Sequence, residues 1–247
     1  MKTPLRFLLA LLAALPLPTA VAQTPKPSDD LGGRSTRETA EGKATAAEKW
    51  ISLFDGRTLT GWHQLDGAAK YEVRDGAIVG TVTKGVTKNS FLATDGVAFA
   101  DFVFECEFTC DPGINSGVQF RSTGMKRDVA RVNGYQYEID PTPRALTGGI
   151  QEEGGRNWLA PQTRDGAPLA AWHAAHGDRL KPGEWNALRI ECHGAHLRTW
   201  LNGHALADIE DAARARGFFA LQVHANSKPE MQGKEVAFRN LRVRELK

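Results

Sequence analysis

The chain has 247 residues, with 31 Lys and Arg against 29 Asp and Glu and a formal net charge of +2. Hydrophobic residues make up 41% and charged residues 24%, a globular balance that excludes a collagen, a coiled coil and a disordered chain. The near-neutral charge also argues against a nucleic-acid-binding protein, which concentrates basic residues on one surface.

The first 22 residues have the pattern of a secretory signal peptide. Lys2 and Arg6 precede an apolar run, Phe7–Leu17, and Ala20–Ala22 provides a small-x-small cleavage site. The run is too short for an ordinary membrane span, so a membrane-anchoring helix is the weaker alternative. We predict cleavage after Ala22, which leaves 29 basic and 29 acidic side chains, no membrane association and a periplasmic or secreted protein.

Residues 23–48 are polar and show no apolar period, so we predict a flexible leader, with a short helix over Ala40–Lys49 as an option. From residue 49 to residue 247 the texture changes to short apolar segments between Asp-Gly and Asn-Gly pairs, which are typical of hairpin turns. This pattern predicts one all-β domain of the sandwich class. The expected strands are Ile51–Phe54, Tyr71–Arg74, Ala77–Thr81, Ser90–Ala93, Phe102–Cys110, Gly117–Ser122, Tyr135–Asp140, Trp185–His193, Leu197–Leu201, Phe218–His224 and Val236–Glu245.

Cys106, Cys110 and Cys192 follow no metal-binding spacing. Cys106 and Cys110 lie about 13 Å apart along a strand, too far for a direct disulfide. Either can still pair with Cys192 if the strands are neighbours, but we favour three small core residues.

The segment between Gly148 and Pro182 is expected to form long loops that carry Trp158, Trp172 and two His residues. Such loops either form one wall of a binding site or merely cover a sheet edge. Five tryptophans are candidates for stacking on sugar rings, namely Trp62, Trp158, Trp172, Trp185 and Trp200. Trp185 and Trp200 lie inside strand patterns and are expected to serve sheet packing.

Residues of like parity in a strand share a face, and three strands place polar residues opposite an apolar set. The polar residues are Gln119 and Arg121, then Gln136, Glu138 and Asp140, then Gln222 and His224. Long hydrogen-bonding side chains of this kind suit a polyhydroxylated ligand. The alternative is an ordinary solvated face, since every sandwich requires alternation.

Seven motifs in chain order resemble the DUF1080 family, the 3-keto-disaccharide or 3-keto-glycoside hydrolase domain. The resemblance runs from about Trp50 to Leu246 and implies a concanavalin A-like jelly-roll β-sandwich that binds sugar over a concave sheet. The motifs are Trp50-x-x-Leu53-Phe54-Asp55-Gly56-x-x-Leu59-x-Gly61-Trp62, Asn115-Ser116-Gly117-Val118-x-Phe120-Arg121, Gly134-Tyr135-x-x-Glu138-Ile139-Asp140, Glu184-Trp185-Asn186, Leu201-Asn202-Gly203, Leu221-Gln222-x-His224 and Phe238-Arg239-Asn240-Leu241.

The resemblance implies cleavage of glycosides whose sugar already carries a ketone at C3. A base removes the acidified C2 proton, the resulting enolate expels the C1 substituent, and water adds to the 2-hydroxy-glucal to complete a net hydrolysis. We expect Glu138 and His224 to act as base or acid and Arg121 to stabilise the enolate oxygen. Asn115 and Gln222, which also fit the family's motifs, are expected to bind substrate, together with Gln119, Gln136, Asp140 and Trp158.

No cofactor is required by the motifs, but Glu138, Asp140 and His224 could together hold a divalent cation that polarises the ketone, and the sequence leaves this question open. The sequence departs from the family in two places. Asp140-Pro141-Thr142-Pro143 breaks a polar stretch, and the segment Thr147–Ile150 lacks the aromatic residue that follows it in relatives. The second departure bears on how the sugar is oriented.

Two alternative functions fit the same fold. A two-carboxylate glucanase needs E-x-D-x-x-E spacing, of which Glu138 and Asp140 supply two positions while Pro143 occupies the third. Glu105 and Glu107 form another same-face pair. A lectin-like binding domain needs no catalytic residue at all, but three titratable groups on one face favour an enzyme.

Overall fold

The computed structural model describes residues 49–85, 87–124 and 132–247. The chain divides into two units, residues 1–43 and 44–247. The predicted signal peptide and leader, and the predicted helix up to residue 48, lie outside the described residues. Within the described part of the chain, no helix is long and apolar enough to cross a membrane.

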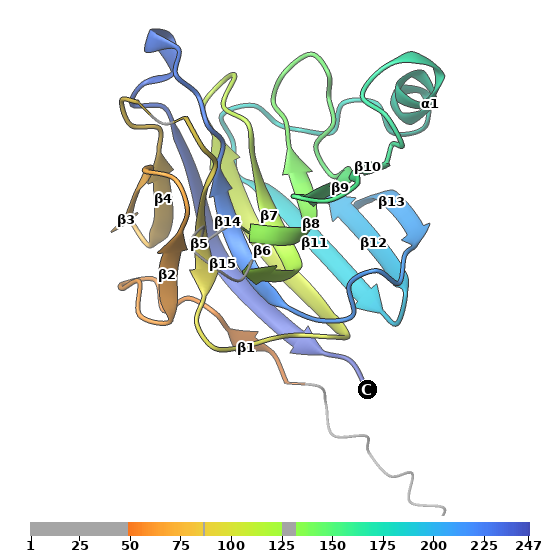
Figure 1. Cartoon of the computed structure of the whole chain (residues 1–247), viewed down its shortest axis with the longest axis horizontal. Coiled ribbons are helices and arrows are strands. Elements are labelled where there is room, and N and C mark those ends of the chain that lie inside the picture. Colours follow the sequence, from red (N-terminus) through yellow and green to blue (C-terminus); the bar gives the residue numbers. More distant parts are fainter. Residues whose placement is uncertain (1–48, 86, 125–131) are drawn as a thin grey trace, which may run out of the picture. The chain divides into compact units, whose positions relative to one another are not determined.

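Two antiparallel sheets pack face to face to form a β-sandwich of the jelly-roll type (Figure 1). Sheet A has the strand order β13-β12-β11-β6-β15-β4-β3, with β1 paired to β15. Its strands are β1 (Ile51–Ser52), β3 (Lys70–Arg74), β4 (Ala77–Thr81), β6 (Phe102–Cys110), β11 (Asn186–His193), β12 (His196–Leu201), β13 (His204–Glu210) and β15 (Glu235–Glu245). Sheet B has the order β10-β9-β8-β7-β14-β5-β2. Its strands are β2 (Trp62–Leu65), β5 (Ser90–Thr94), β7 (Ser116–Gly124), β8 (Val132–Ile139), β9 (Ile150–Glu153), β10 (Asn157–Ala160) and β14 (Phe218–Val223).

Alternating aromatic residues build the core between the sheets. Phe102, Phe104 and Phe108 of β6 point inward and are fully buried. Phe219 of β14 reaches across from sheet B, with its ring centroid 4.5 Å from that of Phe104 and 4.8 Å from that of Phe102. The prediction of which residues in these strands point into the core is therefore confirmed. The alternate residues of the sheet B strands point to the outer face, where the polar residues lie.

Each of the eleven expected strands has a counterpart, and the predicted all-β sandwich is confirmed. Asp75-Gly76 and Asn202-Gly203 form hairpin turns in which both residues have positive φ, between 52° and 81°. Such paired positive angles match the twist of a two-residue hairpin. The sequence analysis did not anticipate β2, β9, β10 and β13.

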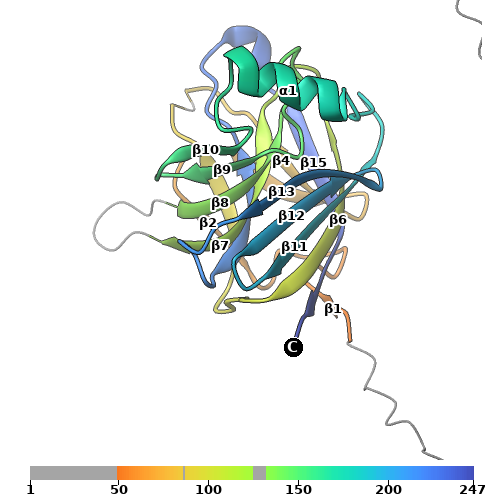
Figure 2. The same ribbon diagram turned by 90° about the vertical axis from the view of Figure 1, so that its right-hand side faces the viewer.

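The prediction of long loops between Gly148 and Pro182 was wrong. This segment contains β9, β10 and the helix α1 (Gly166–His176), which Figure 2 shows lying across one end of the sandwich. The run from Leu169 to His176 contains four Ala and no β-branched residue, so its helix propensity was readable. Trp172 anchors the helix in the core and donates from Nε1 to the Ala145 carbonyl at 3.3 Å.

The three cysteines are buried free thiols, as we favoured from the sequence. Cys106 and Cys192 sit in neighbouring strands but face Leu188 and Phe102 in the register. Burial raises the pKa of Cys110 to about 11 and that of Cys192 to about 12, so these thiols are unreactive core groups.

Candidate functional site

The outer face of sheet B brings together most of the polar residues singled out in the sequence. The register places Gly117 of β7 between Glu138 of β8 and Gln222 of β14. One pair further along, Gln119 lies opposite Gln136. Glu138 and the three glutamines, Gln119, Gln136 and Gln222, are almost completely buried. Strand pairing alone thus assembles a row of amides around one carboxylate.

The amides form a directed chain of hydrogen bonds that ends on Glu138. Ser122 Oγ donates to Gln119 Oε1 at 2.9 Å, and Gln119 Nε2 donates to Gln136 Oε1 at 2.6 Å. Gln136 Nε2 then donates to Glu138 Oε2 at 2.9 Å. Each amide in the chain turns its positive end towards the carboxylate, which orders Glu138 in one position.

Gly117 makes room for this chain. A Cβ atom at position 117 would lie 2.6 Å from Cδ of Gln136 and 2.7 Å from its Nε2. Any side chain at this position would therefore displace Gln136 from Glu138. The close approach of the Gln136 side chain explains why a glycine occupies position 117 inside a strand.

Glu138 accepts two further hydrogen bonds from neutral donors. Asn115 Nδ2 donates to Oε1 at 2.5 Å, and Gln151 Nε2 donates to Oε2 at 3.2 Å. Burial raises the pKa of Glu138 to about 7, and the bonds from Asn115 and Gln136 only partly offset it. A carboxyl group with this pKa exchanges protons readily near neutrality, which is the property of a general base or acid.

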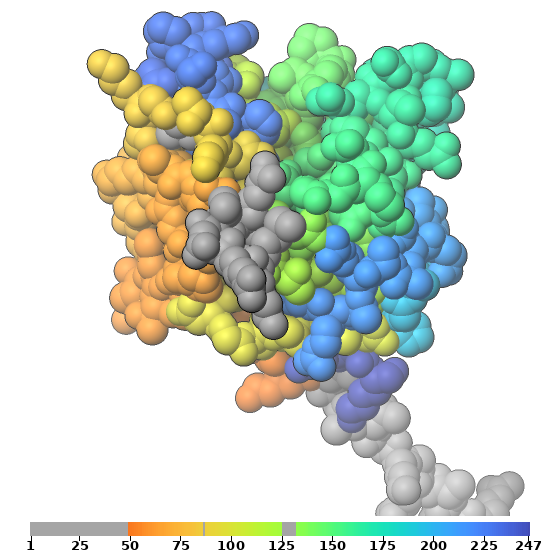
Figure 3. Space-filling view, in the orientation of Figure 1, coloured from red at the N-terminus to blue at the C-terminus, as the bar shows by residue number. Residues whose placement is uncertain are grey.

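A cavity of about 220 Å³ opens above Glu138. Its walls come from β8, β9, β10 and adjoining loops. Figure 3 shows the green surface of residues 132–176 and the blue surface of residues 224–234 at one end of the sandwich. The volume is below the range of about 300–1,000 Å³ usual for drug-sized ligands. The cavity is lined by Asn89, Asn115, Glu138, Arg144, Gln151, Glu153, Trp158, Arg164 and His224.

His224 follows β14 and is the second titratable group of the sequence prediction that lines the cavity. Its Nδ1 lies 2.8 Å from the Ala225 carbonyl and donates to it, so the neutral ring keeps Nε2 as a proton acceptor. Asn89 Oδ1 accepts from the Ala225 N–H at 2.9 Å and holds this turn in place. Desolvation by the surrounding atoms lowers the pKa of His224, although the residue keeps an exposed surface.

Trp158 supplies an aromatic wall from β10. In the register it lies opposite Gln151, on the face that carries Glu138. A Cβ atom at Gly149 would come within 3.2 Å of the Trp158 ring, so this glycine permits the close packing of the indole. Trp158 therefore places an indole ring next to Gln151, from the neighbouring strand.

The prediction that Arg121 shares this site was wrong. Arg121 has a φ of 45° at a bulge in the pairing of β7 with β8, which turns its side chain away from the row of amides. The guanidinium is buried and donates to the carbonyls of Ala100 at 2.8 Å and Gly194 at 2.7 Å. It also pairs with Asp101 at 3.0 Å. Arg121 therefore ties loops together and is not free to meet a substrate.

Asp140 also differs from its predicted role. Its Oδ2 pairs with Arg144 Nη2 at 2.9 Å, and its Oδ1 accepts from the Thr142 hydroxyl at 2.6 Å. The carboxylate does not line the cavity but positions Arg144, which does. Within the ranges that the structure describes, no cluster of three or more His, Cys, Asp or Glu is arranged to hold a metal ion. Glu138, Asp140 and His224, which we considered from the sequence as ligands of a divalent cation, are thus not arranged as a metal site.

Gln119, Gln136 and Gln222 lie beneath the cavity rather than in its wall. They support Glu138, whereas Asn115 and Trp158 face the cavity as expected. Sequence reasoning missed five residues of the wall, namely Asn89, Arg144, Gln151, Glu153 and Arg164. Ile150–Glu153 has the sequence Ile-Gln-Glu-Glu, which shows no apolar alternation, so the sequence carried no strand signal that would place Gln151 and Glu153.

Several solved structures have a fold similar to that of this chain. A candidate glycosyl hydrolase from Parabacteroides distasonis aligns with a TM-score of 0.57 at 20% identity, over 81% of this chain and 95% of its own. A Bacillus subtilis protein of unknown function with a galectin-like fold gives 0.58 at 10% identity, over 80% and 94%. The apo Crh5 transglycosylase gives 0.52 at 11% identity, over 81% and 84%. At these identities the likeness shows the fold alone, and no curated protein matches the sequence.

The family comparison is more specific. The family model described as a 3-keto-alpha-glucoside-1,2-lyase-like domain matches residues 49–244, which is most of the chain. This match agrees with the ordered motifs. The chain belongs to the 3-keto-α-glucoside-1,2-lyase-like domain family.

Proposed function

We propose that the protein is a secreted enzyme that cleaves 3-keto-glycosides by β-elimination followed by hydration. The observation that carries the proposal is the buried Glu138 carboxyl, held by three neutral amide donors at the floor of a polar cavity, with a pKa of about 7. The family match supports a carbohydrate-active protein.

In the first step Glu138 takes the proton from C2, which the C3 ketone has acidified. The electron pair of the C2–H bond forms the enolate, and its return expels the C1 oxygen with the bonding pair. His224 in its imidazolium form gives a proton to that oxygen and becomes neutral. Both groups line the same cavity, so one substrate can contact both.

The second step reverses the proton flow. Water adds at C1 of the glucal while neutral His224 takes a proton from it, and Glu138 returns its proton to C2. The net reaction is hydrolysis, and both residues regain their starting states. No oxidant or reductant is needed, because the ketone enters with the substrate.

The enolate oxygen needs a donor, and Arg144 is the group that we assign to it. Its guanidinium lines the cavity and is held by Asp140 from behind. Its backbone carbonyl lies 2.6 Å from His173 Nε2 of α1, which fixes the loop to the helix. A fixed cation at the site of developing negative charge lowers the barrier without reorganisation.

The leaving group has its own space. A second cavity of about 430 Å³ lies on the other side of Trp158 and shares Gln151, Trp158 and Arg164 with the first. We assign the 3-keto sugar to the cavity above Glu138 and the C1 substituent to this neighbouring cavity. The indole then forms a wall common to both rings.

Direct hydrolysis by two carboxylates is the second candidate, because Glu153 lines the same cavity as Glu138. The carboxylates that the sequence offered for this route lie elsewhere. Asp140 is paired with Arg144, and Glu105 and Glu107 belong to sheet A.

The two routes separate on matched substrates. Purified mature protein is incubated with a chromogenic 3-keto-glucoside and with the unoxidised glucoside. We expect aglycone release from the keto sugar alone, with exchange of the C2 hydrogen for deuterium in D₂O. Release from the unoxidised glucoside would overturn the proposal in favour of a two-carboxylate glycosidase. Binding of the keto sugar without release would leave a lectin-like domain.

A further inference from the structure

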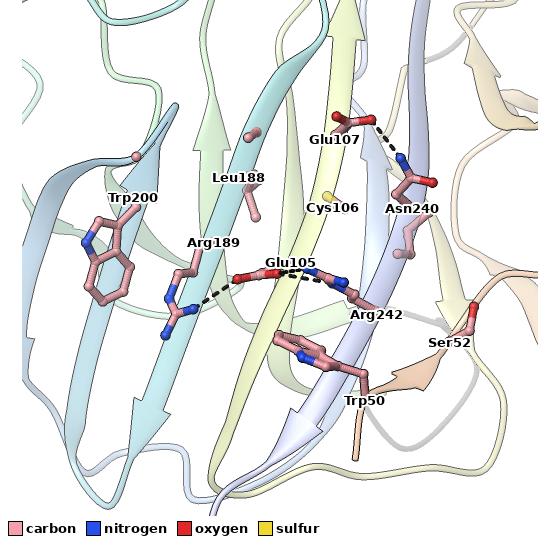
Figure 4. Close-up of a pocket in the computed structure, with 13 residues that line it drawn as sticks. Trp50, Ser52, Glu105, Cys106, Glu107, Leu188, Arg189, Trp200, Asn240 and Arg242 are labelled. Atoms are coloured by element: carbon pink, nitrogen blue, oxygen red, sulfur yellow. Dashed lines mark hydrogen bonds and ion pairs between the residues drawn. The ribbon is translucent and has the colours of Figure 1, made fainter. Parts of the chain in front are cut away.

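A hollow distinct from the two cavities described above lies on the outer face of sheet A. It has a volume of about 780 Å³, within the range usual for ligand sites, and its lining contains none of the residues around Glu138. Figure 4 shows labelled residues of its lining on β12, β11, β6, β15 and β1, with Trp200 at the β12 side and the Trp50 indole beside Glu105 and Arg242. We call it the sheet A groove.

One cross-strand row forms the groove. The register aligns Trp200 of β12 with Arg189 of β11, Arg189 with Glu105 of β6, and Glu105 with Arg242 of β15. Three strand spacings of about 4.8 Å make the row about 14 Å long. Trp50 completes it at the β15 end. The row therefore runs from one indole to another across a length that suits several linked small rings.

Both indoles are half-buried on the outer surface and are fixed by cations. The Arg242 guanidinium carbon lies 4.4 Å from the centroid of the Trp50 ring. The guanidinium carbons of Arg189 and Arg198 lie 5.2 Å and 5.5 Å from that of Trp200. Trp200 therefore packs on the outer face of the sheet and not in the core. Indoles fixed at a surface present rigid apolar area at low entropic cost.

The charges between the indoles compensate one another. Glu105 accepts from Arg189 at 2.9 Å and from Arg242 at 2.7 Å, and Glu107 accepts from Asn240 at 2.8 Å. The lining holds two Arg and two Glu. The lining residues themselves therefore carry no formal net charge, and they offer many donors and acceptors for hydroxyl groups.

Small residues keep the groove open. Ala187 and Gly203 are exposed members of its lining and project little into it. A flat neutral ligand with ring faces for the indoles and hydroxyls for the charged row fits these features together. We propose that the sheet A groove binds a neutral oligosaccharide or polysaccharide chain, separately from the cavity above Glu138.

Affinity electrophoresis tests this binding. The mature protein is run through native gels that contain laminarin, dextran, galactomannan or arabinoxylan, with polygalacturonate as the charged counterpart. We expect retardation by at least one neutral polymer, and the Kd for that polymer to weaken about tenfold or more in Trp50→Ala and in Trp200→Ala, because each loses one stacking contact. Trp200→Phe retains a flat ring and is expected to restore most of the binding.

Trp185→Ala is the matched control. Trp185 stacks with Arg239, at 3.9 Å, and does not line the groove, so its removal should leave retardation unchanged. Trp158→Ala should also leave it unchanged, because Trp158 belongs to the other site. An unretarded wild-type protein in all neutral gels, retention by polygalacturonate alone, or retention that survives both groove substitutions would overturn the proposal. Loss of retention in Trp158→Ala would assign the binding to the cavity above Glu138 instead. Each variant's thermal unfolding midpoint shows that it is folded.

Discussion

Glu138 and Glu191 are largely buried carboxylates on the outer faces of the two sheets, yet their surroundings are opposite. Glu138 receives hydrogen bonds from neutral amides only, and burial raises its pKa to about 7. Glu191 is also subject to desolvation, but Arg189, at 2.8 Å, and Arg198 outweigh it and hold the pKa below the ordinary value.

The difference shows that deep burial with neutral donors raises the pKa of a carboxyl group in this fold, whereas shallower burial with cationic donors lowers it. Amide donors order a carboxylate while leaving its charge uncompensated, so the proton stays exchangeable near neutrality. Guanidinium donors stabilise the ionised form, which lowers the pKa of the carboxyl group and makes the carboxylate a weaker base. The same alternation of polar and apolar residues produces both arrangements.

The largest effect is expected from Glu138→Gln, which retains the size of the side chain but removes the base. We expect kcat for the 3-keto-glucoside to fall about 10³-fold, within the range of about 10²–10⁴ for loss of a general base. In the wild type, kcat/KM should pass through a maximum with pH, because the reaction needs Glu138 ionised, which a pKa of about 7 opposes at acid pH, and His224 protonated, which its lowered pKa opposes at alkaline pH. Steady-state rates between pH 5 and 9 measure both effects. A variant with wild-type kcat would remove Glu138 from the mechanism.

Arg121→Gln tests the role of Arg121, the cationic residue that we predicted from the sequence to lie beside Glu138. The change removes the guanidinium donors from the carbonyls of Ala100, Gly194 and Arg214 and from the Asp101 carboxylate, which keeps the Gly194 N–H as a donor. We expect the free energy of unfolding to fall by about 3 kcal/mol, because several hydrogen bonds of a buried guanidinium, each contributing about 1 kcal/mol, are lost together. Urea denaturation measures this loss. The kcat of the folded fraction should stay at the wild-type value; a variant of wild-type stability with lost turnover would return Arg121 to the active site.

Stability against pH sharpens the contrast further. Folded Glu138 keeps its proton up to about pH 7, whereas the unfolded chain loses it near 4.5, so wild-type stability falls as the pH rises through this window. The amide introduced by Glu138→Gln does not titrate. The stability of this variant relative to the wild type should therefore grow by about 3 kcal/mol between pH 4.5 and pH 8. Urea unfolding at several pH values checks this slope, and a flat difference would mean that Glu138 is not desolvated.

The fold and the row of amides could be predicted because they depend on strand parity, which is local in the sequence. Phe104 predicted the core, and Gln119, Gln136 and Glu138 followed from the opposite parity. Arg121 failed because a bulge with positive φ reverses parity at a single residue, and its sequence context does not mark it. Arg144 was missed because its place depends on α1, a contact across 29 residues of sequence.

The smallest effect is expected from Glu191→Gln, the matched counterpart of Glu138→Gln on the other sheet. Arg189 keeps Glu105 as a partner, so the loss of charge at position 191 should lower the free energy of unfolding by only about 1–2 kcal/mol at pH 7. Because the pKa of Glu191 is lowered on folding, its contribution is present above the unfolded pKa and is lost as the pH falls. The stability difference should therefore shrink towards acid pH, opposite to that of Glu138→Gln. Turnover of the 3-keto-glucoside should not change. If the two variants share one pH slope, or if Glu191→Gln is inactive, then donor charge does not separate the two carboxylates.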